Sequence, residues 1–354
     1  MGTTSQKLQN IVNCKAAVRT AVQNSLSLWG ITLPDKLSDW ADRLTNARTV
    51  KITGNVSNYE YSYTFGSRNL TYASTTKQPF ADTITTVDLS GIGSVSESGF
   101  NGAFNHCASL SSVIFPDNGL YGTGSNTFNS MFSYCTNLKN ATVPIRFSDK
   151  SSMFGGMFQY SGLQQLAIDF KFESGNYSNY ILTNICRGCT PLTKFTMSGL
   201  KTLVYRNQTQ PFFGMDGNNA FYGCTNLKEV EINDLETFNV TTTSGRGFGL
   251  VSGTGTMNIA SVKCPDLKTI TTSNSSSVPT QSFFVGTSST SNRRTIQNIY
   301  LPKLTQVSPY AFNCVSNCTF HFGAENRTAI EALTNYSNHF SGYGGDTTTF
   351  VFDL

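Results

Sequence analysis

The sequence predicts a mainly β solenoid of short parallel strands, preceded by an N-terminal helical hairpin. A motif of aromatic, cysteine, leucine and β-branched residues recurs along residues 83–323, at intervals that begin in the twenties and lengthen toward the C-terminus. Residues 1–47 show instead the apolar spacing of three to four residues that is typical of amphipathic helices. Only 13% of the 354 residues are charged and 12% are aromatic. This composition excludes disorder over most of the length.

The N-terminal segment, residues 1–47, is expected to form two amphipathic helices. Gly30 can end the first helix, while Pro34 and Asp35 suit the first turn of the second. The apolar faces have no obvious partner in the chain, so we expect this segment to dock onto another protein or to oligomerise. The residues assigned to docking are Leu8, Ile11, Val18, Val22, Leu26, Trp29, Leu37, Trp40 and Leu44.

Two β-rich or mixed segments flank the repeats. Residues 48–82 are predicted to form a β-rich connector, because apolar and aromatic residues partly alternate from Val50 and Ile52 to Tyr59, Tyr61, Tyr63 and Phe65. Residues 324–354 are predicted to form a C-terminal cap, with a helix over 324–333 and a strand over 347–352. A solenoid needs such blocking ends.

The repeat itself reads Phe-x-x-Cys-x-x-Leu-x-x-Val-x-Ile, with copies that begin at Phe104, Phe132, Phe158, Cys186 and Phe221. A period in the twenties with this strand line predicts a leucine-rich-repeat solenoid, in which each coil buries its apolar face on its neighbours. Small cysteines fit a column that recurs in every coil. The predicted repeat core is Phe104, Cys107, Leu110, Val113, Phe132, Cys135, Leu138, Phe158, Leu163, Cys189, Leu192, Phe221, Cys224, Leu227, Val230, Leu267 and Phe312.

Two segments of the chain resemble known families. Ala103-Phe104-x-x-Cys107-x-x-Leu110-x-x-Val113-x-Phe115-Pro116, and the matching run from Ala220 to Ile232, resemble the BspA-like branch of leucine-rich repeats. That resemblance implies a recognition scaffold without a common ligand. Leu8–Leu28 and Asp35–Leu44 resemble a helical segment that precedes fibre, baseplate or adhesin modules in phage structural proteins. That second resemblance implies a virion protein.

The residues that carry chemistry are few and scattered. His106, His321 and His339 form no general-base pattern, so we expect structural or solvent-facing roles for them. The nine cysteines are an odd number and fall largely in repeat register, which favours reduced, buried thiols. The pairs Cys186/Cys189 and Cys314/Cys318 have spacings that zinc or redox sites also use, but lie too far apart in the repeat series to share one ion.

One acidic cluster and a set of tyrosines remain as candidates for function. Glu229 and Glu231 alternate about Val230 on one strand face, with Asp234 and Glu236 following. Paired carboxylates can hydrolyse glycosidic bonds, although a solvated face explains the same pattern. The tyrosines less tied to the repeat suit glycan or protein contact if exposed, and packing between coils if buried. They are Tyr59, Tyr61, Tyr63, Tyr177, Tyr180, Tyr205 and Tyr222.

The sequence as a whole favours a non-enzymatic phage virion protein, a head or tail fibre or a decoration protein. It would bind other virion proteins through its N-terminal helices, form a homo-oligomer and contact a host surface glycan or protein. A net charge of +4 argues against nucleic acid, and no apolar run is long enough to span a membrane. No signal peptide, cofactor or metal is expected. The alternatives are a BspA-type adhesin on the bacterial cell surface and a polysaccharide depolymerase.

Overall fold

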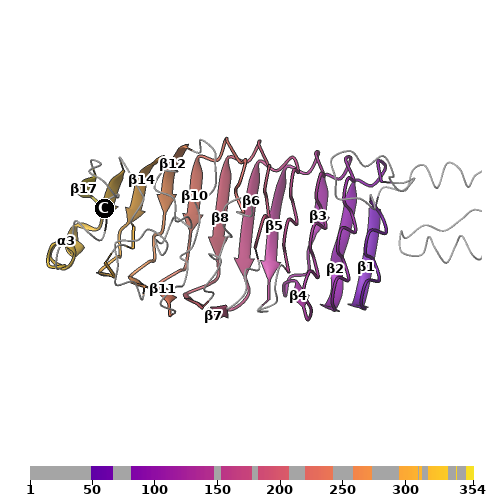
Figure 1. Ribbon diagram of the computed structural model, residues 1–354, viewed down its shortest axis with the longest axis horizontal. Coiled ribbons are helices and arrows are strands. Elements are labelled where there is room, and N and C mark those ends of the chain that lie inside the picture. Colours follow the sequence, from indigo (N-terminus) through magenta and orange to yellow (C-terminus); the bar gives the residue numbers. More distant parts are fainter. Residues whose placement is uncertain are drawn as a thin grey trace, which may run out of the picture.

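Strands from successive coils lie side by side along the long axis of the computed structural model, from β1 at one end to β17 at the other (Figure 1). The structure describes residues 49–66, 81–146, 153–177, 182–206, 220–241, 258–272, 295–309, 311–312, 318–333, 340 and 348–354. The predicted helical hairpin over residues 1–47, with all of its docking residues, lies outside the described residues.

Three parallel sheets make up the described strands. The four-stranded sheet contains β1 (Thr49–Val56), β2 (Thr86–Val95), β3 (Ser112–Ile114) and β4 (Tyr121–Gly122). The eight-stranded sheet contains β5 (Asn140–Ile145), β6 (Gln165–Phe170), β8 (Lys194–Ser198), β10 (Glu229–Ile232), β12 (Asn258–Lys263), β14 (Thr295–Leu301), β16 (Thr319–Phe322) and β17 (Thr349–Phe352). The five-stranded sheet contains β7 (Ser174–Tyr177), β9 (Thr202–Tyr205), β11 (Thr237–Val240), β13 (Thr269–Thr272) and β15 (Gln306–Val307).

Each full coil supplies one strand to the eight-stranded sheet and, after a corner, one to the five-stranded sheet. β8 and β9 belong to one coil, and β10 and β11 to the next. Alternate side chains of the first strand point inward and meet their counterparts in neighbouring coils. Leu166, Phe195 and Val230 form one such inward column, and all three are fully or almost fully buried. The predicted parallel solenoid is therefore confirmed.

A third wall of each coil consists of turns whose backbone bonds link one coil to the next. Phe104 N–H donates to Met131 O at 2.9 Å, and Phe132 N–H donates to Met157 O at 2.8 Å. The rings on this wall stack in a continuous buried column, with centroids 5.6 Å apart for Phe104 and Phe132 and 5.7 Å for Phe132 and Phe158. Stacking of equivalent residues therefore holds this wall together.

The stretch over residues 57–66, which is part of the predicted β-rich connector, does not form a strand. Tyr59 and Tyr63 have φ values of 59° and 53°, and the segment forms turns of the third wall rather than extended chain. Tyr61 and Phe65 stack instead on Phe100 and Phe104 of the next coil. Because β1 also pairs with β2, residues 49–56 already belong to the coils, although they lie inside the segment assigned to a connector.

The residues predicted to form the repeat core lie inside the coils. All of them are completely buried except Val113, which is half-buried. At the C-terminal end, the helix expected over 324–333 is shorter: η4 (Ala324–Asn326) leads into α3 (Arg327–Glu331). β17 follows and pairs with β16 as the last strand of the eight-stranded sheet.

Candidate functional site

The outward face of the eight-stranded sheet carries a compact ion cluster. Glu229 and Glu231 on β10 lie between Lys194 on β8 and Lys263 on β12. Lys194 Nζ is 2.9 Å from Glu231 and 3.4 Å from Glu229, while Lys263 Nζ is 2.8 Å from Glu229 and 3.4 Å from Glu231. Each carboxylate is therefore shared by two ammonium groups from the neighbouring coils.

This pairing argues against the polysaccharide depolymerase hypothesis at Glu229 and Glu231. A glycosidase needs one carboxyl group with a raised pKa to act as the general acid. The hydrogen bond from Lys263 instead lowers the pKa of Glu229, and the charge of Lys194 acts in the same direction. The two carboxylates form ion pairs that link adjacent coils.

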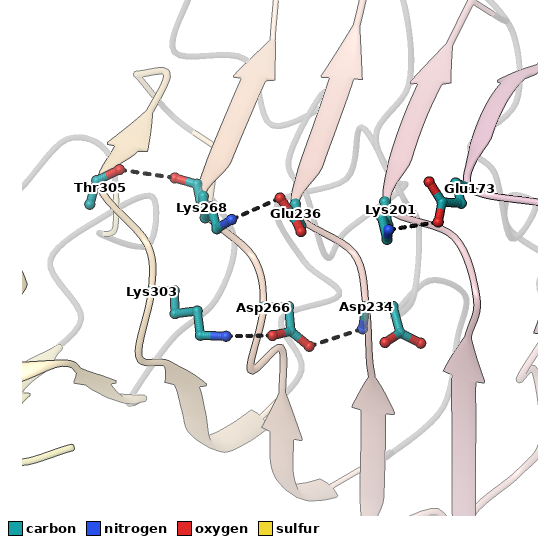
Figure 2. Close-up of polar contacts among 8 residues, drawn as sticks. All are labelled: Glu173, Lys201, Asp234, Glu236, Asp266, Lys268, Lys303 and Thr305. Carbon is teal, nitrogen blue, oxygen red and sulfur yellow. Dashed lines mark hydrogen bonds and ion pairs between the residues drawn. The ribbon is translucent and has the colours of Figure 1, made fainter.

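The other two members of the acidic cluster lie at the corner between the two larger sheets, where Figure 2 shows two rows of polar contacts. Glu236 accepts a hydrogen bond from Lys268 at 2.8 Å. Asp234 accepts from Gly199 N–H at 2.8 Å and donates its own N–H to Asp266 at 3.1 Å. All four acidic residues therefore have partners from another coil, and they do not form one site.

The described histidines also serve the stacking of coils. His321 lies on β16, where its Nδ1 is 3.1 Å from Asp353 and its Nε2 is 3.2 Å from Asn298 Oδ1. Its ring stacks on Tyr300 at 4.5 Å. His106 stacks on Tyr134 at 4.2 Å on the turn wall. His339 lies outside the described residues.

Cys107, Cys135, Cys189 and Cys224 form the internal column that the repeat register predicts, and each thiol hydrogen-bonds to the preceding coil. Cys135 Sγ donates to Phe104 O at 3.3 Å, Cys189 Sγ to Phe158 O at 3.0 Å and Cys224 Sγ to Cys186 O at 3.1 Å. Burial raises the pKa of Cys189 to about 12, so the thiol is neutral.

No group of three or more His, Cys, Asp and Glu side chains in the described part of the chain is placed to hold a metal ion. Cys186 lies in the column of phenylalanines and Cys189 in the column of cysteines, in keeping with their repeat register. Cys314 lies outside the described residues, so its pairing with Cys318 has no structural description. None of the described helices is long and apolar enough to cross a membrane.

The candidate tyrosines divide between core and surface. Tyr205 is completely buried and Tyr61 nearly so, whereas Tyr59 is 62% exposed. Tyr63 and Tyr222 are half-buried. Tyr180, and the side chain of Tyr177, lie outside the described residues. The described tyrosines among these candidates therefore do not form one exposed aromatic surface.

A cavity that the sequence did not predict opens where the four-stranded sheet meets the eight-stranded one. β3 and β5 belong to successive coils, but no backbone hydrogen bond joins these two described strands. The space between them has a volume of about 440 Å³, within the range of ligand pockets in proteins. We call it the β3–β5 slot. Its lining residues are Val113, Phe115, Pro116, Asp117, Asn140, Ala141, Thr142, Pro144, Asp169 and Lys171.

The slot results from a difference in length between two coils. Leu110 and Leu138 are equivalent positions of the repeat, and Leu120 and Ile145 meet in a β-bridge. The stretch from Leu110 to Leu120 is three residues longer than the stretch from Leu138 to Ile145. The additional residues form a turn that Gly119 N–H closes onto Pro116 O at 2.9 Å. The extra length carries the first coil away from its neighbour.

Six copies of the BspA type leucine rich repeat region match residues 80–185 and 217–338. The chain belongs to this family. The BspA-type match begins after the N-terminal segment, so the comparison lends no support to the phage-like interpretation of that segment. No curated protein matches the chain. A crystal structure of a leucine-rich repeat protein from Bacteroides ovatus is similar with 15% identity and a TM-score of 0.24, over 86% of this chain and 72% of that one.

The BspA-type repeats contain a sequence signal that relates to the slot but does not predict it. Ala141 stands where Leu166, Phe195 and Val230 stand in later coils, so the inward column has a small residue there. The spacing between Phe104 and Phe132 is regular for the repeat and does not indicate that one coil is longer before Leu120. Recognising the slot required knowing that Leu120 pairs with Ile145.

Proposed function

We propose that this BspA-type chain is a non-enzymatic binding protein that presents the outward faces of its sheets to a partner, as a bacterial cell-surface adhesin does. The observation that carries this proposal is the division of the strands into two faces. Inward residues such as Phe195 and Val230 are completely buried, so the described interior is filled by the chain itself. Outward residues such as Lys194, Thr196 and Glu231 are polar and held in register by neighbouring coils.

The pairing of charges supports binding rather than catalysis. The carboxylates of Glu229 and Glu231 are neutralised by lysines, and the matching family is a repeat family rather than a catalytic one. A rigid polar face with few uncompensated charges suits recognition that depends little on salt. The partner would be a host surface glycan or a host surface protein.

The proposal predicts where the protein is found. Fractionation of a culture of the source, followed by mass spectrometry, should recover this chain with the bacterial cell envelope. Recovery in density-purified virus particles at constant copy number would contradict the adhesin proposal. It would favour the phage virion interpretation, which depends on residues 1–47 and on their resemblance to virion segments.

Binding is tested with the full chain on fixed host cells. A double variant, Lys194→Glu with Lys263→Glu, reverses the positive charges of the outward cluster and should weaken attachment at least tenfold. Lys201→Glu is the matched control, since Lys201 pairs with Glu173 at 2.6 Å at the corner, away from this face. Equal attachment by both variants would show that the outward face of β8 to β12 is not the binding surface.

We also propose that residues 1–47 dock or oligomerise the protein, because their amphipathic pattern leaves an apolar stripe to be covered. Light scattering of the full chain and of a chain without residues 1–47 tests this. We expect the truncated chain to have a lower assembled mass. An unchanged mass would contradict the proposed docking role.

A further inference from the structure

We propose that the β3–β5 slot binds one neutral sugar unit of a glycan, a hexose or an N-acetylhexosamine. This inference rests on the proposed binding function and adds the class of ligand and the place where it binds. Three properties of the slot carry it: a partly exposed apolar floor, polar groups without a partner among the described residues, and a shape that is closed at its end.

The floor of the slot is a part of the core that is covered in later coils. Val113 and Ala141 are half-buried, whereas Leu166 and Phe195, which follow Ala141 in the inward column, are 1% and 0% exposed. Phe115 is also half-buried, and its ring meets Phe132 edge-on at 6.2 Å. Exposed core surface costs free energy, so a ligand with an apolar face gains by covering it.

The rim of the slot carries hydrogen-bonding groups that the described fold does not use. Asp117, Asn140 and Thr142 are exposed, and their side chains make no hydrogen bond or ion pair with any other described residue. On the same sheet face, Glu229 and Glu231 are fully paired with lysines. Acceptor groups without a partner among the described residues therefore lie beside the slot. The acidic side chains of β10, in contrast, are ion-paired with lysines of the neighbouring coils.

Backbone groups add to this set. In the regular sheet, Gln165 N–H of β6 donates to Lys139 O of the preceding coil, and Lys194 N–H of β8 donates to Gln164 O. The corresponding bond from Asn140 to Ser111 is missing between the described strands β3 and β5. The facing edges of the two strands are thus left with unused peptide groups, which donate and accept as sugar hydroxyls do.

The closed end of the slot favours a sugar over a peptide strand. Leu120 N–H donates to Pro144 O at 2.8 Å and Arg146 N–H donates to Leu120 O at 3.0 Å, so the two coils rejoin at one end of the opening. A peptide that added to a strand edge would need to run along that edge, and this contact blocks its path. A compact ring with an apolar face and polar rim does not meet this obstacle.

The charges at the rim select against acidic sugars. Asp117 carries a carboxylate with no ion pair among the described residues, and the second acid of the lining, Asp169, is neutralised by Lys171 at 2.6 Å. A carboxylate accepts strong hydrogen bonds from hydroxyl groups but repels a sugar acid. Neutral hexoses and N-acetylhexosamines are therefore expected to bind, and sialic acid is not.

The test uses saturation-transfer NMR on the full chain with methyl glycosides of glucose, galactose, mannose, N-acetylglucosamine, N-acetylgalactosamine and sialic acid as probes. At least one neutral glycoside should receive saturation from the wild-type chain, and the sialic acid glycoside should not. An acetylated and amidated hexapeptide of alternating threonine and valine is included as the strand probe. Saturation of the peptide alone, of sialic acid alone, or of no probe would overturn the proposal.

Two variants locate the binding. Ala141→Leu restores the large residue of later coils and fills the floor, so it should reduce saturation at least tenfold without lowering the unfolding midpoint. Asp117→Asn should reduce it about tenfold through the loss of one charge-assisted hydrogen bond. Glu97→Gln, an exposed acid outside the slot lining, is the control and should bind as the wild type does.

These variants keep the proposal separate from the proposed function. If Ala141→Leu is unstable, the Asp117→Asn variant tests the slot by itself. This change should not affect folding, because the exposed Asp117 side chain has no hydrogen bond or ion pair with another described residue. Saturation that survives in a folded Ala141→Leu or in Asp117→Asn would place the sugar elsewhere and overturn the assignment of the slot. Attachment to host cells that persists in both variants would leave the adhesin proposal standing while the sugar site fails.

Discussion

The stacked aromatic column of the turn wall is expected to be a main source of stability. Phe132 is completely buried, and its ring lies 5.6 Å from Phe104 on one side and 5.7 Å from Phe158 on the other. Phe132→Ala removes the middle ring of this column. Because every coil is held only by its neighbours, the loss affects both interfaces of one coil.

The magnitude follows from the buried area. A buried phenylalanine covers roughly 150 Å² of apolar surface, and at about 25 cal/mol per Å² this corresponds to ~4 kcal/mol. Two lost ring contacts and the cavity left behind act in the same direction, so the free energy of unfolding should fall by about 4–5 kcal/mol. Phe115→Ala is the matched control, because its ring is half-buried and makes one edge contact with Phe132. We expect about 1–2 kcal/mol there.

Urea unfolding followed by circular dichroism measures both variants. Hydrogen exchange should show that protection is lost first in the turns around Phe132, because the stability of stacked repeats is local. A loss below about 1.5 kcal/mol for Phe132→Ala, or a loss equal to that of Phe115→Ala, would refute the argument. It would mean that the column contributes through coil geometry and not through burial of its rings.

Three further predictions concern charge, thiols and backbone. The lysine contacts that lower the pKa of Glu229 below its ordinary value near 4.5 stabilise the fold above that pH, and this contribution disappears as the pH falls through the lowered pKa. In the Glu229→Gln variant, the free energy of unfolding should therefore decrease less between neutral and acidic pH than in the wild type, by a measurable difference of up to ~1 kcal/mol. Urea titrations at several pH values measure it, and an acid profile equal to that of the wild type would contradict the prediction. Cys189, whose pKa burial raises to about 12, should stay unmodified by iodoacetamide in the native chain and react in urea, as peptide mass mapping will show; native labelling would disprove its burial. Gly188→Ala would place a methyl group against the Tyr160 ring at a φ of +72° and should cost ~2 kcal/mol more than Gly54→Ala, which has a φ of +82° and open space around it; equal costs in urea unfolding would refute the contact.

The repeat core could be predicted because its signal is local and recurs. Phe104, Cys107 and Leu110 reappear one repeat later as Phe132, Cys135 and Leu138, and this constant offset alone indicates that equivalent residues stack. Within the β-rich connector predicted over residues 48–82, the part around Tyr59–Tyr63 forms turns and not a strand, for a physical reason. Partial alternation of tyrosines has the period of a strand, but here Tyr59 and Tyr63 adopt positive φ and the chain turns.

The acidic cluster shows the limit of reasoning from neighbours in sequence. Glu229 and Glu231 were correctly expected on one face of a strand, since side chains alternate along it. Their partners, Lys194 and Lys263, belong to the coils before and after and are distant in sequence. The sequence suggested a candidate pair of carboxylates, and the tertiary structure showed two ion-paired groups.

The sequence alone was enough to predict the solenoid, its parallel strands and the residues of its interior. The reason is that the pattern of apolar residues is set within one coil and recurs in the next. The place where two coils separate emerged only from the three-dimensional arrangement. Three extra residues before Leu120 leave β3 and β5 unpaired with each other, and Val113 and Ala141 lie half-buried between them. Register between coils depends on which distant backbone groups meet, and that choice is made by the stacking of the whole chain.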